Sequence, residues 1–380
     1  MRESAFSQVI GQEDAIRRLI QCAREDRVPQ ALLFCGAPGV GKMALAMGFA
    51  AYLLTEGTPS LPVTANNAEA MLRQWEHPDL HFAFPTIKPK SAGGDYKPIS
   101  EDFARPWHDL IMQGPYFTLE QWLRQMGATT QQGIITAREG DELVRKLSLK
   151  SGFGGYKIAL IWLPERARPE FSNGILKLLE EPPRHTVFLL VSEEPNLLLD
   201  TIRSRTQRIE VKSISEDNIA RELMARRGIG EDDARRVAHV ANGSWLQALQ
   251  QLSPNNENAE FLQMFETLMR MCYMRNVKEL RQWSLKAADM GREKEKRMLT
   301  YFLSQVRENF MYNFRLPELC YQTREEEAFS RNFARFINEY NVIEIGELFA
   351  KAIRDIGQNA NGKMVFFDMA LQLIVLILRK

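Results

Sequence analysis

One segment near the start of the chain restricts its fold more than any other. The apolar run Ala31–Cys35 has the length of a buried strand, the stretch GAPGVGK follows at once, and the next residues, MALAMGFAAYLL, favour a helix. Strand, glycine loop and helix in this order are the context of the G-x-x-x-x-G-K phosphate-binding loop, the P-loop. Its glycines let backbone N–H groups face phosphate oxygens, and its lysine reaches the outer phosphates. We therefore predict nucleotide-binding positions at Gly36, Gly39, Gly41 and Lys42.

Other apolar runs predict a parallel sheet that helices cover on both faces. Lys157–Trp162 and Thr186–Ser192 are almost continuously apolar, as expected of strands buried on both sides. Between them, FSNGILKLLE predicts a helix that Pro182 and Pro183 end. An earlier helix is predicted by an apolar stripe after Gln12, formed by Ile16, Leu19, Ile20 and Ala23. The predicted fold class is α/β, with this domain covering residues 1–212.

The helical and strand periodicity weakens between about Thr58 and Ser151. Pro, Gly and Ser accumulate from Pro85 to Pro98, which is typical of an irregular excursion. We therefore predict that residues 58–151 are an insertion in the first domain.

No strand is predicted after Val211. Ser215 is a predicted N-cap, and helical segments fill residues 213–252, which we expect to form a small module. Residues 253–257 (SPNNE) are predicted as a linker. The remainder carries aromatic and methionine residues at helical spacing, so residues 253–380 are expected to form an all-α domain.

The oxygen ligands of a hydrolytic P-loop are missing. The residue after the lysine is normally Ser or Thr, whose hydroxyl binds magnesium, but here it is Met43, and a thioether is a poor ligand for a hard cation. The later strand, where an acid is expected, ends in Trp162, Leu163 and Pro164, and Glu165 follows about three positions late. A positioned base alone contributes about 10²–10⁴-fold to a rate. We therefore predict no intrinsic ATPase activity; the loop would hold ATP or ADP weakly or persist only as a tight turn.

Neither cysteine nor histidine spacing predicts a metal site. Cys22, Cys35, Cys272 and Cys320 lie far apart, which favours reduced thiols over a zinc site. His77 and His81 are separated by four positions, but Pro78 between them predicts an extended turn.

The charge balance excludes a stand-alone nucleic-acid coat protein. Lys and Arg number 49 against 48 Asp and Glu, a net charge of +1. Basic and aromatic residues alternate between Arg270 and Arg315, but the acids among them favour solvated helix faces over DNA contacts. The most apolar run, Met364–Leu378, is interrupted by Asp368 and Gln372, so it does not predict a membrane-spanning helix. We expect a soluble, cytoplasmic protein.

Four segments together carry a family resemblance. VIGQEDAIRRL, VPQALLFCGAPGVGK, NGILKLLEEPP and TIRSRT resemble the clamp-loader branch of the AAA+ proteins, specifically the delta-prime type of subunit in the bacterial DNA polymerase III holoenzyme. The resemblance covers about Phe6 to Leu252, and NGKMVFFDMALQLIVLIL is similar to the last helix of the clamp-loader collar. It implies an AAA+ P-loop domain, a three-helix lid and a helical collar for oligomerisation.

The resemblance also implies partners. The chain would join gamma/tau and delta subunits in a hetero-pentamer that loads the sliding clamp on primed DNA, as part of a DNA-directed DNA polymerase holoenzyme, a nucleotidyltransferase complex. Ser204, Arg205 and Thr206 match the family's Ser-Arg-Cys motif, whose arginine enters the ATP site of the adjacent subunit; threonine here replaces cysteine. Such an arginine finger is worth about 10³–10⁵-fold in turnover. The plain alternative is a surface arginine at a helix end.

Further correspondences concern the nucleotide pocket. The segment Ile10–Gln12 matches the family's adenine-side segment, and Ser192 matches its first sensor. Gln247, in GSWLQA, stands where the second sensor has an arginine, so a third functional element is missing. Many delta-prime relatives carry a four-cysteine zinc module after the P-loop helix, whereas the predicted insertion has no cysteine, so we expect no zinc.

Two functions are compatible with this pattern, and a third fits poorly. The first is a non-hydrolysing arm that donates Arg205 in trans. The alternative is an ATP-hydrolysing subunit of gamma/tau type with an unrecognised acid. A helicase-loading or protein-remodelling AAA+ protein would need catalytic acids that the chain lacks, and it would not explain the helical C-terminal third. Nucleotide binding, the contacts of the insertion, direct DNA contacts and self-association are left open by the sequence.

Overall fold

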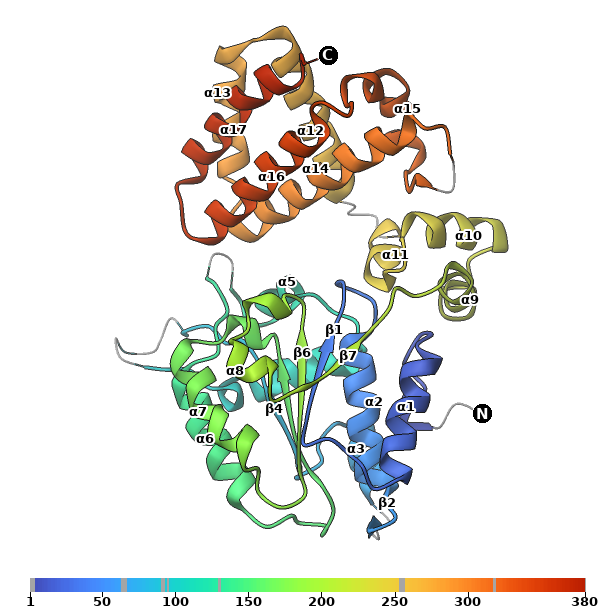
Figure 1. The fold of residues 1–380 in the computed structure, drawn as a ribbon, viewed down its shortest axis with the longest axis vertical. Helices are drawn as coiled ribbons and strands as arrows, with labels where there is room; N and C mark the ends of the chain where they lie inside the picture. Colours follow the sequence, from blue (N-terminus) through green and yellow to red (C-terminus); the bar gives the residue numbers. More distant parts are fainter. Residues whose placement is uncertain are drawn as a thin grey trace. The chain divides into compact units, whose positions relative to one another are not determined.

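The computed structural model describes residues 4–62, 67–89, 93, 96–128, 131–252, 257–316 and 319–379. The chain divides into two compact units, Met1–Ala248 and Leu249–Lys380. The first contains a five-stranded parallel sheet with helices on both faces, and the described part of the second contains helices and no strand (Figure 1).

The sheet has the order β4-β5-β6-β1-β7. Its strands are β1 (Ala31–Cys35), β4 (Leu80–Ala83), β5 (Lys157–Trp162), β6 (Thr186–Ser192) and β7 (Gln207–Glu210). The predicted strands at 31–35, 157–162 and 186–192 are confirmed. Cys35 pairs in register with Ser192 of β6 and with Glu210 of β7, so these three strands end together at the same end of the sheet. A separate hairpin is formed by β2 (Gly57–Thr58) and β3 (Leu61–Pro62).

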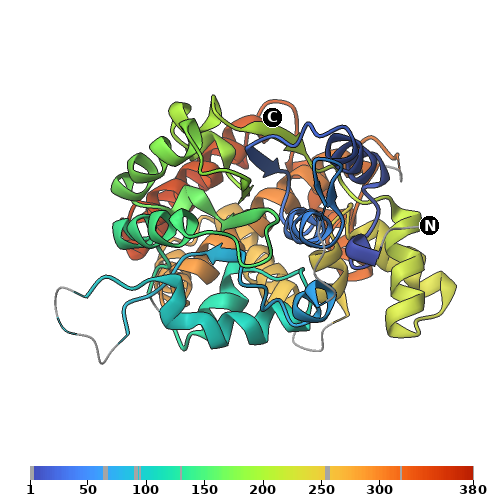
Figure 2. The ribbon, with the colours of Figure 1, turned by 90° about the horizontal axis from the view of Figure 1, so that it is seen from below.

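Alternation along each strand divides the apolar runs between two cores. In β1, Leu32 and Phe34 pack into the core that also contains α2 (Lys42–Thr55), with α1 (Glu13–Arg24) on the same side. Leu33 and Cys35 face the opposite core, with α6 (Ala137–Ser148) and α7 (Pro169–Glu180). Figures 1 and 2 show these two helix layers on opposite faces of the sheet. Each fully buried Leu or Phe side chain stabilises the fold by about 1.5–3 kcal/mol.

The predicted insertion at 58–151 requires a correction. Part of this range builds the main sheet, because Leu80–Ala83 is the edge strand β4 and pairs in parallel with β5, while α6 covers the second face. The strand escaped the sequence pattern because it is short and half-buried, with the sequence LHFA. The same range also contains α3 (Ala68–Arg73), α4 (Ala104–Gln113) and α5 (Leu119–Gln125), and some of the predicted irregular stretch lies outside the described residues.

Three helices follow the sheet: α9 (Glu216–Arg227), α10 (Glu231–Val240) and α11 (Trp245–Gln251). Ser215 is the N-cap of α9, as predicted, because its side-chain oxygen accepts the Asn218 N–H at 3.3 Å. Gly228 ends this helix in the left-handed conformation, at φ 64°. The predicted linker at 253–257 lies outside the described residues, except for Glu257.

The second unit is built by α12 (Glu257–Met274), α13 (Val277–Ala288), α14 (Arg292–Tyr312), α15 (Arg324–Phe333), α16 (Val342–Gly357) and α17 (Gly362–Leu376). These helices share one core that is rich in phenylalanine, including Phe265, Phe302 and Phe349. The predicted fold class, an α/β P-loop domain followed by three helices and an all-α domain, is confirmed.

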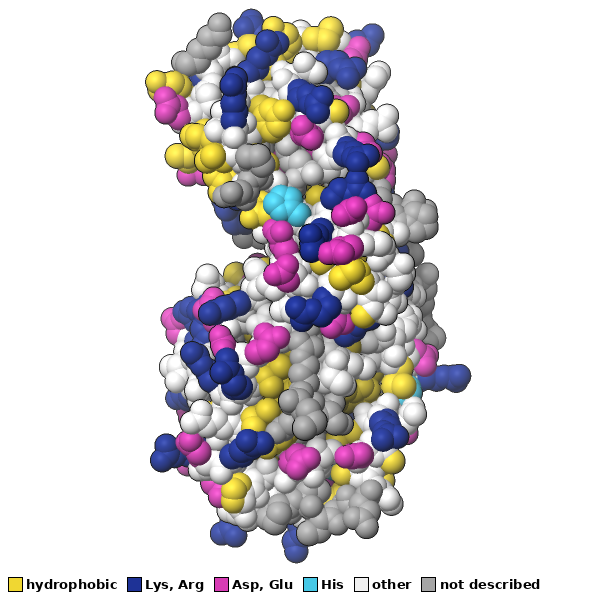
Figure 3. All heavy atoms as spheres, turned by 90° about the vertical axis from the view of Figure 1, so that its right-hand side faces the viewer, with side chains coloured by type: hydrophobic (Ala, Val, Ile, Leu, Met, Phe, Trp, Pro, Cys, Tyr) yellow, Lys and Arg dark blue, Asp and Glu magenta, His cyan; other side chains and the backbone are white. Residues whose placement is uncertain are grey.

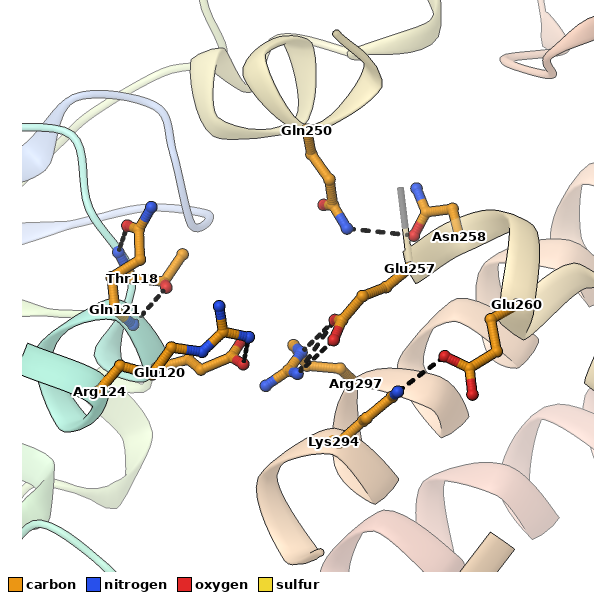
Figure 4. Close-up of polar contacts among 10 residues, drawn as sticks. All are labelled: Thr118, Glu120, Gln121, Arg124, Gln250, Glu257, Asn258, Glu260, Lys294 and Arg297. Carbon is orange, nitrogen blue, oxygen red and sulfur yellow. Dashed lines mark hydrogen bonds and ion pairs between the residues drawn. The ribbon is translucent and has the colours of Figure 1, made fainter. Parts of the chain in front are cut away.

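The charge-rich stretch at the start of α14 is a helix face that pairs with α12. Arg297 contacts Glu257 at 3.0 Å and Lys294 contacts Glu260 at 2.7 Å, and Figure 4 shows both pairs. Pairs with this much solvent access contribute at most about 1 kcal/mol each.

Charges of both signs are interspersed on the face that carries α1 and α10 (Figure 3). Arg17 pairs with Asp14 in α1, and Arg235 pairs with Glu231 in α10 at 2.6 Å. Within the described ranges, no helix is both long and apolar enough to cross a lipid bilayer.

Candidate functional site

The P-loop connects β1 to α2 with three glycines at positive φ. Gly36, Gly39 and Gly41 have φ values of 152°, 82° and 98°. A Cβ on Gly36 would lie 2.4 Å from the Val211 carbonyl oxygen, so only glycine allows this approach. The structure brings together all four residues that the motif predicted.

The Lys42 ammonium is engaged by oxygen atoms of its own chain. Its Nζ donates to the carbonyl oxygens of Gly36 at 2.8 Å and Ala37 at 2.7 Å, and the Glu193 carboxylate lies 3.9 Å away. The side chain is only 5% exposed. Burial lowers the pKa of Lys42, and Glu193 opposes this shift. Sequence reasoning did not identify Glu193, which directly follows β6.

Both positions expected to supply oxygen ligands carry buried apolar side chains. Met43 packs in the core on the α2 side of the sheet. Trp162, at the end of β5, packs against Phe117 with ring centroids 5.0 Å apart and against Trp107 at 5.4 Å. A thioether and an indole are poor partners for Mg²⁺, which prefers oxygen ligands.

Glu165 comes closer to the P-loop than the sequence spacing indicated. Leu163 adopts a left-handed conformation, φ 54°, and the 3₁₀ turn Pro164–Arg166 follows. This turn directs the chain back, so that Glu165 Oε1 accepts the N–H groups of Glu193 at 2.8 Å and Glu194 at 3.2 Å. The carboxylate thus holds the backbone that follows β6 and contributes to the field at Lys42.

The correspondences at the adenine side and the first sensor lie around the same loop. Gln12 Nε2 donates to the carbonyl oxygens of Val40 at 3.2 Å and Lys212 at 2.6 Å, and so ties the start of α1 to the P-loop and to the end of β7. Ser192 is fully buried at the end of β6, beside Cys35, and its Oγ has no hydrogen-bond partner within the described structure.

The start of α11 lies directly on the P-loop. Ser244 Oγ donates to the Pro38 carbonyl at 3.0 Å, and the Trp245 N–H donates to the Gly39 carbonyl at 3.0 Å. A Cβ on Gly39 would lie 2.1 Å from Ser244 Oγ, so glycine is required here too. Gln247, at the second-sensor position, is exposed.

Tyr116, which the sequence analysis did not single out, completes the surroundings of the loop. It lies between α4 and α5, and its hydroxyl accepts the Ile10 N–H at 2.9 Å. The same hydroxyl would be 2.9 Å from a Cβ on Gly41. Its ring lies edge-on to Trp245, with centroids 6.5 Å apart. No sequence signal identifies this contact, because Tyr116 and Ile10 are 106 positions apart.

The arginine motif lies on the connection between α8 (Asp200–Arg203) and β7. Arg205 donates from Nη1 to the Thr201 carbonyl at 2.9 Å and pairs through Nη2 with Glu180 at 2.5 Å. The side chain remains 34% exposed. Ser204 and Thr206 donate their hydroxyls to main-chain carbonyls of α8, which fixes the turn around the arginine. Glu180, the last residue of α7, is a further residue that sequence reasoning missed.

Topology separates the arginine from the P-loop of the same chain. The P-loop follows β1, whereas Arg205 precedes β7, and the two strands are parallel. The two motifs therefore lie at opposite ends of the strand pair, separated by about five residues at roughly 3.3 Å each.

The residues around the loop fit a phosphate group better than they fit a metal-bound nucleotide. The glycine conformations and the helix start at Lys42 are those that an anion requires. Met43 and Trp162 offer no oxygen to magnesium. Of the carboxylates near the loop, Glu193 lies 3.9 Å from the Lys42 ammonium and Glu165 accepts two backbone N–H groups.

Comparison with known proteins gives one family. The model of the family described as "DNA polymerase III, delta subunit" matches residues 11–215, more than half of the chain. The tau/gamma subunit of DNA polymerase III from Haemophilus influenzae is 26% identical over 255 residues, which are 65% of this chain and 30% of the relative.

Two delta' subunits of DNA polymerase III are also similar. The one from Bacillus subtilis is 25% identical over 250 residues, 66% of this chain and 61% of the relative. The one from Pseudomonas aeruginosa is 30% identical over 177 residues, 46% of this chain and 40% of the relative. The chain thus spans less than two thirds of the length of each of these curated relatives.

Proposed function

The chain belongs to the DNA polymerase III delta subunit family, and from this premise we propose that it is a clamp-loader subunit of the non-hydrolysing, delta-prime type. It would serve as an AAA+ arm that donates Arg205 to the ATP site of a neighbouring subunit. Two delta' relatives support this proposal, although a tau/gamma relative matches a similar share of the chain.

One observation carries the proposal: apolar side chains occupy both positions where magnesium ligands are expected. Met43 is 6% exposed and Trp162 is 4% exposed, and both are packed in the core. A positioned base contributes about 10²–10⁴-fold to a hydrolytic rate, and a metal supplies several kcal/mol of charge stabilisation besides. Without both, the P-loop of this chain has little means of cleaving a phosphoanhydride.

The position of Arg205 supports action in trans. The guanidinium lies at the strand end opposite to its own P-loop, and about a third of its surface is exposed. A neighbouring γ-phosphate would have to displace Glu180 from the guanidinium. That exchange is inexpensive, because ion pairs with such access to solvent contribute about 0–1 kcal/mol. In the phosphoryl-transfer transition state the guanidinium would stabilise developing negative charge.

The proposed partners follow from the family. The chain would join gamma/tau and delta subunits in a hetero-pentamer, and the assembly would load a sliding clamp on primed DNA during replication. Gly36, Gly39, Gly41 and Lys42 would bind ATP or ADP weakly or not at all, and neither zinc nor another cofactor would be required.

ATP turnover by defined assemblies tests the proposal. The isolated chain should hydrolyse ATP at the background rate. In a reconstituted assembly, Arg205→Ala in this chain should lower DNA-dependent turnover by at least about 100-fold at the affected site. Arg203→Ala, which removes a neighbouring arginine paired locally with Asp200, is the matched control and should leave turnover within about twofold. Robust hydrolysis by the isolated chain, or equal effects of the two variants, would refute the proposal.

A hydrolysing subunit of gamma/tau type is the second candidate, and the position of Glu165 favours it. The carboxylate reaches the loop that follows β6 and acts electrostatically on Lys42. If Glu165 were a catalytic base, Glu165→Gln would abolish turnover by the isolated chain. If it only supports the backbone, as proposed here, there is no such turnover to lose.

A further inference from the structure

We propose that Tyr116 is an internal occupant of the P-loop pocket and that it excludes nucleotide from this chain. The proposal goes beyond the arginine role, since it concerns the chain's own loop and holds whether or not Arg205 acts in trans. The ligand class that Tyr116 would exclude is a nucleoside di- or triphosphate.

Tyr116 contacts three separate segments around the P-loop. Its hydroxyl accepts the Ile10 N–H at 2.9 Å, so a main-chain donor of the N-terminal segment is already engaged. A Cβ placed on Gly41, the last glycine of the P-loop, would lie 2.9–3.4 Å from the hydroxyl and the ring of Tyr116, so this side chain lies directly against the loop. The third segment is α11, because the ring of its first residue, Trp245, lies edge-on to the Tyr116 ring with centroids 6.5 Å apart. A nucleotide bridging the N-terminal segment and the loop would overlap this side chain.

The neighbouring residue fixes Tyr116 in place. Phe117 is 8% exposed and packs edge-on against Trp107, with centroids 5.5 Å apart, and against Trp162 at 5.0 Å. Trp162 ends β5, where a hydrolytic P-loop protein would carry an acid. In this chain, the same position anchors the segment that carries Tyr116, so loss of the acid and closure of the pocket share one structural cause.

The turn around Tyr116 is also held from its other side. Thr118 and Gln121 form a capping box at the start of α5: the Thr118 N–H donates to Gln121 Oε1 at 2.8 Å, and the Gln121 N–H donates to Thr118 Oγ1 at 3.2 Å (Figure 4). Gly114 ends α4 at φ 133° and gives the chain the freedom to turn there. Tyr116 therefore lies on a short connection between two fixed points, and the connection presents its ring to the P-loop.

Hydrogen bonds from the start of α11 also hold the P-loop in place beside Tyr116. Ser244 and Trp245 hydrogen-bond to the carbonyls of Pro38 and Gly39, so α11 is held on the loop beside Tyr116. Lys42 is meanwhile engaged by two main-chain carbonyls and by Glu193. Nucleotide entry would have to break contacts of both kinds, and Tyr116 contacts the N-terminal segment, the loop and α11.

Binding of ADP to the full-length chain tests the proposal. Calorimetric titration, with ADP as the probe, should show no saturable binding to the wild-type chain at ADP concentrations up to about 1 mM. Tyr116→Ala should bind ADP at least tenfold more tightly than the wild type. Tyr156→Ala removes a half-buried tyrosine of the same unit that lies before β5, and it should behave as the wild type. Combining Lys42→Ala with Tyr116→Ala should remove the gain if ADP enters the P-loop.

Each result decides the matter. Equal ADP affinity of the wild type and a folded Tyr116→Ala, whether both bind or neither does, overturns the proposal, and so does a gain that survives Lys42→Ala. Circular dichroism establishes folding. If Tyr116→Ala does not fold, Tyr116→Leu takes its place, because it removes the ring and the hydroxyl that accepts the Ile10 N–H but keeps an apolar side chain. In this variant the Ile10 amide hydrogen should exchange with solvent faster than in the wild type, and the affinity for ADP should be higher. If neither the exchange rate nor the ADP affinity changes, the proposal is overturned.

Discussion

Lys42 and Arg205 are two cations at opposite ends of the β1–β7 strand pair, and their surroundings differ. Lys42 is 5% exposed and has oxygen partners within its own loop and on the segment after β6. Arg205 is 34% exposed, and its carboxylate partner, Glu180, is 49% exposed. Removal of a buried cation leaves its internal partners unpaired and destabilises the fold, whereas a cation near solvent can exchange one carboxylate for another anion at little cost. The difference suggests which motif serves structure and which remains available to a partner.

The largest expected loss of stability comes from separating α11 from the P-loop, at the end of the strand pair that carries Lys42. Gly39→Ala places a Cβ 2.1 Å from Ser244 Oγ and 3.0 Å from Leu246 Cβ, at φ 82°. The combined clash and backbone strain should lower the free energy of unfolding by about 3 kcal/mol. Gly228→Ala is the control, since φ there is also positive, 64°, but among the described residues nothing lies within 4 Å of its Cβ. It should cost about 1 kcal/mol. Equal losses in urea unfolding would show that α11 does not close on the loop.

Replacing each of the two cations by methionine should lower the stability of the chain by different amounts. Lys42→Met leaves two carbonyls and Glu193 without their partner, so the isolated chain should lose about 2 kcal/mol of stability. Arg205→Met removes a partly exposed pair and should cost less than about 0.5 kcal/mol. Thermal unfolding of both variants, in the same buffer, compares them directly. If Arg205→Met were the more destabilising change, the contrast between the two ends would be wrong.

One pH dependence of stability is expected in the first unit, at Glu139. Glu139, in α6, accepts the N–H of Ser100 at 2.5 Å, and Ser100 lies just before α4, the helix that precedes Tyr116. Burial raises the pKa of Glu139 to about 7. Because the folded pKa exceeds the unfolded one, the stabilisation is complete at low pH and is lost as the pH rises through about 7. Between pH 6 and pH 8 the loss should be about 1 kcal/mol.

Glu139→Gln should remove this loss, because glutamine does not titrate. Glu101→Gln, at a nearby exposed carboxylate that pairs with Lys146, should leave it unchanged. Urea unfolding at the two pH values measures both variants. A pH slope that is the same in Glu139→Gln and the wild type would assign the dependence to another group.

The smallest effect is expected at the arginine end. Glu180→Gln should change the stability of the chain by less than about 0.5 kcal/mol. In an assembled complex it should leave turnover unchanged or raise it by up to about fivefold, because a competing carboxylate is removed from Arg205. Glu181→Gln, at the adjacent exposed position, controls for the loss of charge. A fall in turnover with Glu180→Gln would mean that this carboxylate positions the arginine instead of competing for it.

Double-sided burial explains which parts of the fold were predictable. The central strands β1, β5 and β6 are buried on both faces, so their sequences are almost continuously apolar and their bounds were predicted correctly. The edge strand β4 contains a histidine and is half-buried, so no comparable pattern marks it. The P-loop glycines were predictable because their conformations exclude other residues.

The surroundings of the P-loop were much less predictable. Glu165 reaches the loop only because Leu163 adopts a left-handed conformation, for which leucine gives no sequence signal. The contact between Tyr116 and Ile10 depends on how the α4–α5 connection packs on Trp162, a tertiary arrangement that local periodicity does not encode. Local rules therefore identified the motifs, while long-range packing determines what the motifs can do.

ATP turnover by a reconstituted assembly, in which only this chain is varied, tests the central claim most directly. We expect Lys42→Met, used at a temperature where it remains folded, to leave turnover within about twofold, and Arg205→Ala to lower it by at least about 100-fold at the affected site. The opposite result, with turnover abolished by Lys42→Met and unaffected by Arg205→Ala, would mean that this chain hydrolyses ATP and does not serve its neighbour.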